Sequence, residues 1–327
     1  MAKIYYDSEI ELDSLQDLTL GLIGYGNQGR AHALNLRDSG FSVCVGAREN
    51  GDAYSTAVSD GFDPQTIETV SRTCDLLVLL LPDEHMHDVY VNSIEPYINA
   101  DKVFVFAHGF AVHHQMIVLP EYSDILLVAP AGPGKQLRSL YEQGKGLPAL
   151  VAVGQDGSGL ALPRCLAYGK AIGCSRVGLI ETTFAEETVT DLFCEQAVLC
   201  GGIPELIKRS FSTLVEAGYQ PELAYISCLK EVKLIADLLF DHGIDGMREK
   251  ISTTAQFGSF LTGPEVVNDA TSHGLLKALS RIESGAFAKQ FLSEAKSGSP
   301  TIKSLLKAER LSQLARTGRQ LREDLNF

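Results

Sequence analysis

Short apolar runs alternate with segments of helical periodicity along the first half of the chain. The runs are LTLGLIGYG, FSVCVGA, CDLLVLLLP, KVFVFAHG, DILLVAP and ALVAVG, with helical patterns up to about Ser39, near 53–60 and near 84–98. Continuous apolar runs of this length are typical of strands that are buried on both faces. The pattern therefore predicts an α/β fold, a doubly wound parallel sheet covered by helices on both sides.

The pattern changes after Glu186, where helical periodicity continues with few strand signals. Helices are predicted at 187–201, 203–217, 220–241 and 266–282, separated by Gly201-Gly202 and Gly218. The basic, polar stretch 296–327 is expected to be a loosely packed helical tail. A length of 327 residues suits two domains. We expect an α/β domain at 1–182 and an all-helical domain at 183–327.

Composition excludes several classes of protein. Hydrophobic residues make up 45% of the chain, enough for a packed core. No segment approaches the roughly 18 apolar residues that cross a bilayer, and the start has no signal-peptide pattern, so a cytoplasmic protein with no membrane partner is expected. A net charge of -13 argues against nucleic acid. The cysteines, which include no C-x-x-C pair, are expected to be reduced core thiols: Cys44, Cys74, Cys165, Cys174, Cys194, Cys200 and Cys228.

A glycine-rich turn follows the first long apolar run. It reads Gly24-Tyr25-Gly26-Asn27-Gln28-Gly29, between a predicted strand and a predicted helix. Glycines at this spacing allow a tight turn, close approach of the backbone to a pyrophosphate, and packing of helix on strand. The context favours a Rossmann domain that binds a dinucleotide, over a glycine-rich turn without a ligand.

Three acidic residues recur at four-residue spacing in the stretch 181–202. On a helix, Glu187, Asp191 and Glu195 share one face, which also carries Phe184, Cys194 and Val198. Carboxylates facing an apolar environment repel one another and are costly to desolvate, and a divalent cation such as Mg²⁺ would remove both penalties. The alternative is a solvated acidic face.

Together with further motifs, these features resemble short-form (class I) ketol-acid reductoisomerases over nearly the whole chain. The motifs are Leu81-Pro82-Asp83-Glu84, Ala107-His108-Gly109-Phe110 and Ala129-Pro130. The resemblance implies two Mg²⁺ ions and a nicotinamide cofactor. It implies an alkyl shift in a 2-hydroxy-3-keto acid followed by reduction to a 2,3-dihydroxy acid, in branched-chain amino acid biosynthesis. It also implies an intertwined homodimer or a larger homo-oligomer of dimers.

The resemblance also assigns roles to residues. It implies catalytic roles for His108, Glu231 and Ser252, metal binding by Asp191, Glu195 and Glu231, and cofactor contacts at Gly24, Tyr25, Gly26, Asn27, Gln28, Gly29, Leu81, Pro82, Asp83, His108 and Gly134. Glu231 lies on an apolar stripe of its predicted helix, and a buried acid needs a partner. The alternatives are a surface Glu231 paired with lysine, a structural His108, and Ser252 as a helix cap.

Several charged positions of the family pattern are neutral in this chain. Ala131 stands where the family has lysine, and Ser227 where it has glutamate; Gln256 and Phe257 replace glutamate and tyrosine. Lys135 and Lys230 are new cations nearby in sequence. We therefore favour a specialised reductase that keeps one metal site over an ordinary reductoisomerase. A non-catalytic protein is the least favoured, because Asp191 and Glu195 are retained.

Cofactor choice depends on the segment after the second strand. NADPH-using relatives usually place serines where this chain has Gly51 and Ala53. Glu49 and Asp52 can accept hydrogen bonds from ribose hydroxyls, while Arg48 can stack on adenine or pair with a phosphate. The segment, with Arg48 and Asp52 as cofactor contacts, predicts a preference for NADH over NADPH.

Overall fold

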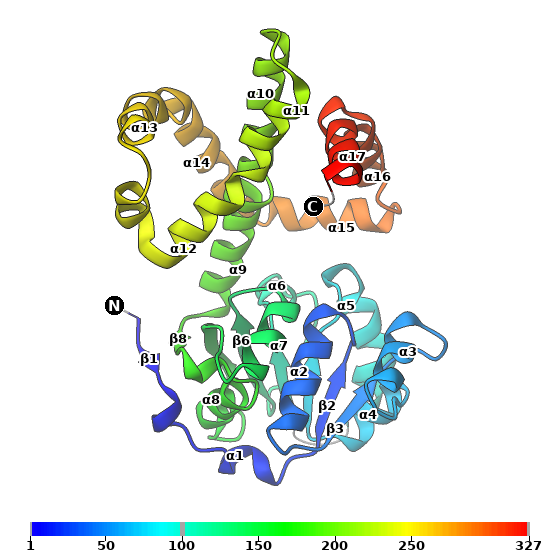
Figure 1. Cartoon of the computed structure of the whole chain (residues 1–327). Coiled ribbons are helices and arrows are strands. Elements are labelled where there is room, and N and C mark those ends of the chain that lie inside the picture. The colour runs from blue at the N-terminus through cyan, green and yellow to red at the C-terminus, as the bar shows by residue number, and fades with distance from the viewer. Residues whose placement is uncertain (1, 99–101, 326–327) are drawn as a thin grey trace. The chain divides into compact units, whose positions relative to one another are not determined.

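The computed structural model describes residues 2–98 and 102–325. The chain forms two compact units, Met1–Thr190 and Asp191–Phe327. The division falls within one helix, α9 (Phe184–Phe193). Figure 1 shows the sheet of the first unit and the helices of the second.

The first unit is built on an eight-stranded sheet with the order β1-β8-β7-β6-β5-β4-β2-β3. Its strands are β1 (Ile4–Tyr5), β2 (Leu20–Ile23), β3 (Val43–Gly46), β4 (Leu76–Leu79), β5 (Val103–Phe106), β6 (Asp124–Pro130), β7 (Ala149–Gln155) and β8 (Leu179–Glu181). β3 lies on one side of β2 and β4 on the other, so the strand order reverses at β2. Rossmann domains bind dinucleotides at such a switch point.

The sheet is mixed, and the expectation of a parallel sheet needs one correction. Strands β3, β2, β4, β5 and β6 are parallel, and β7 is parallel to β8. β7 runs antiparallel to β6, and β1 antiparallel to β8. Asp124, at the start of β6, links the start of β6 to the end of β7. Its carboxylate accepts hydrogen bonds from the amides of Gly157 and Ser158 after β7 and pairs with Arg164 at 2.6 Å.

Helices cover both faces of this sheet. The unit contains α1 (Asp13–Gln16), α2 (Asn27–Asp38), α3 (Asp52–Ser59), α4 (Ile67–Thr73), α5 (Asp83–Val89), α6 (Phe110–His113), α7 (Gly134–Glu142) and α8 (Ala161–Ala171). A π turn, η2 (Tyr90–Ile94), extends α5, and short 3-10 turns are η1 (Asp7–Glu9), η3 (Glu95–Tyr97) and η4 (Cys174–Arg176). Residues of α1, α2, α7 and α8 share one hydrophobic core, and those of α4, α5 and α6 share another.

The alternating direction of side chains along each strand explains why the sheet has a core on each face. Leu76 and Val78 of β4 join the first core, whereas Leu77 and Leu79 join the second. Successive side chains of a strand point to opposite faces, so a strand buried on both faces must be apolar throughout. This is why the strands read as continuous apolar runs in the sequence.

The second unit is helical throughout its described residues. It contains α10 (Gly202–Glu216), α11 (Pro221–Tyr225), α12 (Val232–Glu249), α13 (Thr253–Val266), α14 (Asp269–Glu283), α15 (Ala286–Lys296), α16 (Pro300–Leu311) and α17 (Gln313–Leu325). The prediction of an α/β domain followed by a helical region is confirmed. The predicted helix at 220–241 is wrong in detail, and α13 was not predicted.

Two π turns and a break interrupt these helices. The turns are η5 (Cys194–Leu199), which follows α9, and η6 (Ile226–Lys230), which separates α11 from α12. Gly243 breaks α12 with φ +70°. Apolar periodicity does not distinguish a π turn from an α-helical turn over so few residues, which explains the error.

The C-terminal stretch is more firmly packed than the sequence suggested. Leu321 of α17 is 7% exposed and joins a core with Phe211, Ala224 and Tyr225. A side chain at Gly318 would lie 2.5 Å from the Tyr225 ring. The expectation of a loose tail is therefore wrong for α17.

The cysteines divide into two groups. Cys74, Cys165 and Cys174 are buried as expected, whereas Cys44, Cys194 and Cys200 are exposed and Cys228 is half-buried; all seven are free thiols. The description of all of them as core thiols was wrong, because β3 is an edge strand and η5 is exposed. Among the described residues, no helix is long and apolar enough to cross a membrane.

Candidate active site

The glycine-rich turn lies at the carboxyl end of β2. Gly24 has φ +98°, and a side chain there would lie 2.4 Å from the carbonyl oxygen of Leu80. A side chain at Gly29 would lie 1.9 Å from the Gly24 carbonyl oxygen. These glycines are therefore required for β2 to turn into α2. The first amides of α2, which have no partner within the helix, are suited to a phosphate group.

The start of α7 packs directly on the start of α2. A side chain at Gly134 would lie 2.1 Å from the carbonyl oxygen of Asn27. Asn27 accepts a hydrogen bond from the Lys135 amide at 3.1 Å, and the Gln28 side chain donates to the Gly132 carbonyl at 2.9 Å. The side chains of Asn27 and Gln28 thus fix the turn between β6 and α7 against the glycine-rich turn.

The Tyr25 side chain lies in the interior of the first unit. It is 3% exposed, and its hydroxyl donates to Asp60 at 2.9 Å. Burial is the main reason that the pKa of Tyr25 is raised. Its neighbour Arg30 also binds Asp60, at 2.6 Å, and lowers the pKa of that carboxyl. The Tyr25 side chain therefore supports the turn from within the domain.

The other segments predicted to contact the cofactor follow neighbouring parallel strands. Leu81 and Pro82 follow β4, whose extension is fixed by a hydrogen bond from the Leu80 amide to Ile23. Asp83 opens α5. Arg48 follows β3 and Asp52 opens α3; both are exposed. Because these strands are parallel and in register, their carboxyl ends meet at the edge of the sheet that holds Gly24.

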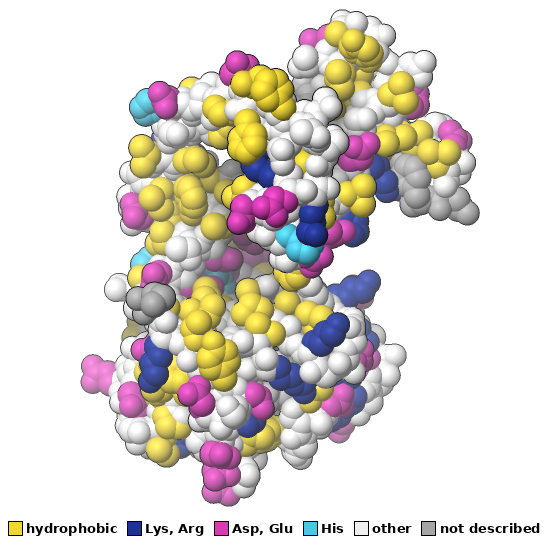
Figure 2. Space-filling model, turned by 60° about the vertical axis from the view of Figure 1, so that its left-hand side comes forward, with side chains coloured by type: hydrophobic (Ala, Val, Ile, Leu, Met, Phe, Trp, Pro, Cys, Tyr) yellow, Lys and Arg dark blue, Asp and Glu magenta, His cyan; other side chains and the backbone are white. Residues whose placement is uncertain are grey.

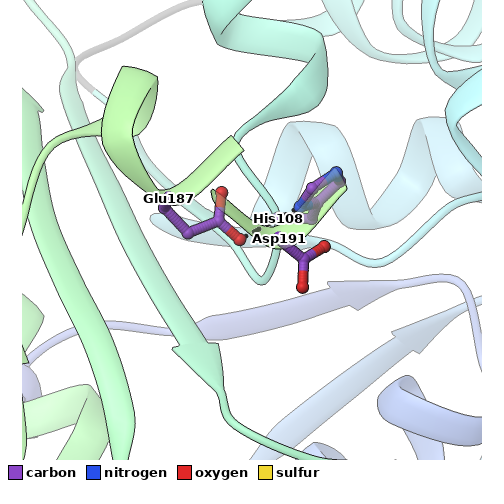
Figure 3. A group of neighbouring side chains, drawn as sticks. All are labelled: His108, Glu187 and Asp191. Carbon is purple, nitrogen blue, oxygen red and sulfur yellow. Dashed lines mark hydrogen bonds and ion pairs between the residues drawn. The ribbon is translucent and has the colours of Figure 1, made fainter. Parts of the chain in front are cut away.

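His108 follows β5 and forms a hydrogen bond with Glu187. Its Nδ1 lies 3.0 Å from Oε1 of Glu187, which is 3% exposed and belongs to α9 (Figure 3). The other carboxylate oxygen accepts a hydrogen bond from the Gly109 amide at 2.7 Å. Because an ionised carboxylate can only accept, Nδ1 of His108 must carry the proton. Glu187 thereby fixes both the tautomer and the orientation of the ring.

Gly109 allows this close packing. A side chain there would lie 2.4 Å from the Thr188 hydroxyl and 2.8 Å from Glu187. Glycine thus lets the loop after β5 reach α9. The same loop places the His108 ring parallel to Phe110, with centroids 6.1 Å apart, and His114 packs on Phe110. Burial, helped by the nearby His113 and His108, lowers the pKa of His114.

Asp191 lies one turn beyond Glu187 on α9. The ligand atoms of His108, Glu187 and Asp191 lie within 4.8 Å of one another (Figure 3). Two carboxylates at this spacing suit a hard divalent cation, with water or substrate oxygens completing the shell. With Nδ1 of His108 bound to Glu187, the ring matches the carboxylate–histidine arrangement found beside metal centres. These residues fit a divalent cation.

Glu195 is not part of this group of three, and its role as a metal ligand stays a prediction. Within residues 2–98 and 102–325, the one group of three potential ligands contains His108 in place of Glu195. Glu195 is the second residue of η5, directly after the α-helix that carries Asp191. In a single chain Glu195 is exposed, as are Cys194 and Val198, whereas Phe184 of the expected face is buried.

Glu231 and Ser252 lie in the second unit. Glu231 is exposed where η6 meets α12, and its apolar neighbour Leu234 is 61% exposed. The interpretation of Glu231 as a buried acid is therefore wrong for a single chain. Ser252 caps α13, its hydroxyl accepting from the Ala255 amide at 3.2 Å, which bears out the helix-cap alternative. Roles for both residues at a substrate stay predictions.

The neutral replacements occupy defined places. Ala131 starts the turn after β6, where its amide donates to the Pro148 carbonyl. Ser227 is exposed on η6. Lys135 lines a groove of about 560 Å³ between α2 and α7 together with Arg30, Asp60 and Glu142. That groove does not include His108.

Sequence reasoning missed the part that Glu187 plays. Glu187 was noted as the first acid of the column but was given no role at the site. The available signal was its position four residues before Asp191, together with the glycine at position 109. A buried carboxylate that accepts from His108 cannot be recognised without the contact between α9 and the loop after β5.

The fold and this site define a nicotinamide-dependent oxidoreductase of the Rossmann class. Residues 14–178 match the family described as acetohydroxy acid isomeroreductase, NADPH-binding domain, and residues 184–327 match ketol-acid reductoisomerase, C-terminal domain. The chain belongs to the ketol-acid reductoisomerase family.

Solved structures agree with this assignment. The chain is similar to an NADH-preferring ketol-acid reductoisomerase from an uncultured archean, with 39% identity, a TM-score of 0.95, and 98% of each chain covered. More distant matches share the fold alone. They include a semialdehyde dehydrogenase NAD-binding protein from Cupriavidus necator, with 16% identity, a TM-score of 0.63, and 84% of this chain and 99% of that chain covered.

Proposed function

We propose that this enzyme is a Mg²⁺-dependent, NADH-preferring reductase for a 2-keto or 2-hydroxy-3-keto acid, with weakened isomerase chemistry. The observation that carries the proposal is Ala131. Its turn is held against the dinucleotide-binding turn by the Gln28 side chain, and its methyl group supplies no charge. Lys135 lines the α2–α7 groove, whose lining residues do not include His108.

Loss of charge affects the two chemical steps unequally. Alkyl migration requires charge to build on both substrate oxygens, which depends on electrostatic stabilisation. Ala131 stands where the family has a lysine, so a cation is missing. Ser227 stands where the family has a glutamate, so a carboxylate of the second metal site is missing. By analogy with single oxyanion donors, each loss reduces the rate roughly 10²- to 10³-fold. Hydride transfer to a carbonyl needs less electrostatic stabilisation than alkyl migration. It requires a polarised carbonyl, a bound substrate carboxylate and a positioned nicotinamide.

The residues of this chain have separate tasks in that reaction. When bound, Mg²⁺ would polarise the substrate carbonyl. Asp191 and Glu195 would hold the ion, and His108, oriented by Glu187, would meet a substrate oxygen. Glu231 and Ser252 would contact the substrate of the neighbouring subunit. Titration of Mg²⁺ by calorimetry tests the metal site. One tight ion that is lost in Asp191→Asn is expected, and two equally tight ions would contradict the proposal.

The preference for NADH rests on the loop after β3. Asp52 opens α3 and Arg48 is exposed beside it. Asp52 and Glu49 would accept from ribose hydroxyls and repel a 2′-phosphate. The similarity to an NADH-preferring relative supports this reading. Comparison of kcat/KM for the two cofactors tests it, and a tenfold advantage for NADPH would show that Arg48 prevails.

An intertwined homodimer, built by residues 183–327, is also part of the proposal. α12 and α13 carry large exposed apolar side chains, among them Phe240 at 83%, Phe257 at 68% and Ile244 at 67%. Figure 2 shows apolar side chains gathered on this helical part of the chain. Monomeric soluble proteins rarely expose such surfaces. Sedimentation velocity is expected to show a dimer or a larger even-numbered oligomer in the cytoplasmic enzyme, and a monomer would overturn this part.

The alternative is an ordinary ketol-acid reductoisomerase of valine and isoleucine biosynthesis. The retained group of His108, Glu187 and Asp191 favours it. The ammonium of Lys230, three residues after Ser227, could also take the place of the second metal ion. Turnover of 2-acetolactate is compared with turnover of its rearranged 3-hydroxy-2-keto isomer. Comparable rates would establish the ordinary enzyme. Reduction of the rearranged acid alone, with isomerisation gained in an Ala131→Lys, Ser227→Glu variant, would support the specialised reductase.

A further inference from the structure

Two cysteines meet at the exposed edge of the sheet in the first unit. Cys44 lies on the edge strand β3, directly opposite Gly21 of β2 in parallel register. Side chains at paired positions of parallel strands point to the same face. Because Gly21 has no side chain, the space beside Cys44 on that face is left for another element.

Cys74 fills this space. Its Cβ lies 2.8 Å, and its Sγ 3.0 Å, from the point where a Gly21 Cβ would be. Cys74 follows α4, is 1% exposed, and belongs to the core on the α4 side of the sheet. Burial, and after it the neighbouring Cys44, raises the pKa of the Cys74 thiol to about 12. Cys74 is therefore a protonated, enclosed thiol beside an exposed one.

We propose that Cys44 and Cys74 form a reversible disulfide that ties β3 to the end of α4 and weakens cofactor binding. The oxidant is a peroxide such as hydrogen peroxide. Cys44 reacts first because it is exposed: its thiolate attacks a peroxide oxygen, the O–O bond breaks, and a sulfenic acid forms as water leaves. The Cys74 sulfur then attacks the Cys44 sulfur, loses its proton, and displaces a second water. Two thiols are oxidised and one peroxide is reduced to two waters.

The disulfide would act on the cofactor turn through β3. Two residues beyond Cys44, the Gly46 carbonyl accepts a hydrogen bond from the Gly24 amide at 3.3 Å. Gln65, just before α4, donates to Val45 and accepts from Ala47. A disulfide requires the two Cβ atoms to lie about 3.5 to 4.5 Å apart, so its closure fixes β3 against α4. Movement of β3 is passed to Gly24 and to the loop that carries Arg48 and Asp52.

The experiment uses the full chain, treated with hydrogen peroxide, alkylated and digested for mass spectrometry. A peptide pair joining Cys44 to Cys74 is expected, about 2 Da lighter than the sum of the two reduced peptides. Dithiothreitol should reverse it. The Kd for NADH, measured by calorimetry on the oxidised and reduced protein, is expected to rise threefold or more on oxidation. Both measurements are independent of which keto acid the enzyme reduces.

Variants separate the roles of the two thiols. Cys74→Ser should accumulate a sulfenic acid at Cys44 that a dimedone probe labels, without a change in Kd. Cys44→Ser, a substitution at an exposed position that is expected to fold, should leave Cys74 unmodified. Cys200→Ser, which removes an exposed thiol of the second unit, should still form the disulfide. Absence of the linked peptides in the wild type, or linkage with an unchanged Kd, would overturn the proposal.

Discussion

Replacement of Glu187 by glutamine tests how the site orients His108. The change keeps the size of the side chain but removes its charge. In the native chain the two carboxylate oxygens accept from Nδ1 of His108 and from the Gly109 amide, at 3.0 and 2.7 Å. A glutamine can present one carbonyl oxygen and one NH₂ group. If its oxygen keeps the Gly109 amide, its NH₂ faces Nδ1, which must then become an acceptor.

The size of the effect follows from these two bonds. A hydrogen bond to a charged group contributes about 1.5 to 3 kcal/mol, and a neutral one about half of that. Both bonds become neutral, which removes about 1.5 to 3 kcal/mol in all. Part of this lowers stability, and the part that acts through the His108 tautomer lowers kcat. We expect kcat to fall about tenfold, since tenfold corresponds to about 1.4 kcal/mol.

Three measurements distinguish this account from general destabilisation. NADH oxidation gives kcat and KM, ¹⁵N NMR reports the His108 tautomer, and thermal unfolding gives stability. The matched control is Glu186→Gln, because Glu186 is exposed and its carboxylate contacts Thr182. Glu187→Gln should move the proton of His108 to Nε2, whereas Glu186→Gln should not. A kcat within threefold of wild type, or an unchanged tautomer, would refute the reasoning.

Other substitutions test packing and pH dependence. Gly29→Ala should lower stability by about 3 kcal/mol because its Cβ meets the Gly24 carbonyl, whereas Gly26→Ala meets nothing within 4 Å and should leave thermal unfolding unchanged. Gly318→Ala should destabilise the second unit by about 1 to 3 kcal/mol, because the new methyl group meets the Tyr225 ring. Its control, Gly274→Ala, places a methyl group in open space and should stabilise the unit by about 0.5 to 1 kcal/mol. Equal effects of the two substitutions in urea unfolding would contradict this expectation. His32 is fully buried, and burial lowers its pKa to about 3. The unfolded chain binds this proton below about pH 6.5 and the folded chain does not, so stability should fall between pH 6.5 and 3, by roughly 3 to 5 kcal/mol in all. The dependence of the unfolding free energy on pH should be weaker in His32→Gln. If urea unfolding at several pH values shows the same dependence in this variant, His32 does not cause it.

The apolar runs were sufficient to predict the buried strands, and the spacing of glycines was sufficient to predict the turn after β2. Their signal is local, since a strand such as β4 must be apolar at every position to face two cores. The antiparallel direction of β7 could not be predicted, because an apolar run shows that a strand is buried and not which way it runs. The contacts between Asp124 and the amides that follow β7 form only in the folded chain. Helix type was equally hidden, since the hydrogen bonds of η5 leave no mark in the apolar pattern.

The candidate site was predictable where one element carries it. Asp191 and Glu187 share α9, so four-residue spacing was informative. The partner of Glu187 comes from the loop after β5, which only the folded chain brings near. Exposure was the least predictable property. Glu231 and Leu234 lie on an apolar stripe that is typical of a buried helix face, yet both residues are exposed in a single subunit.

The short strand β1 has a practical consequence for handling the protein. Ile4 and Tyr5 pair with β8, and the Tyr5 hydroxyl donates to Glu181 at 2.7 Å. An uncovered strand edge is a template for pairing with other chains. A truncation that removes residues 1–6, or a bulky amino-terminal fusion that displaces them, would leave β8 as a bare edge. For expression and crystallisation, affinity tags should therefore be placed at the other terminus, where they cannot promote aggregation through this edge.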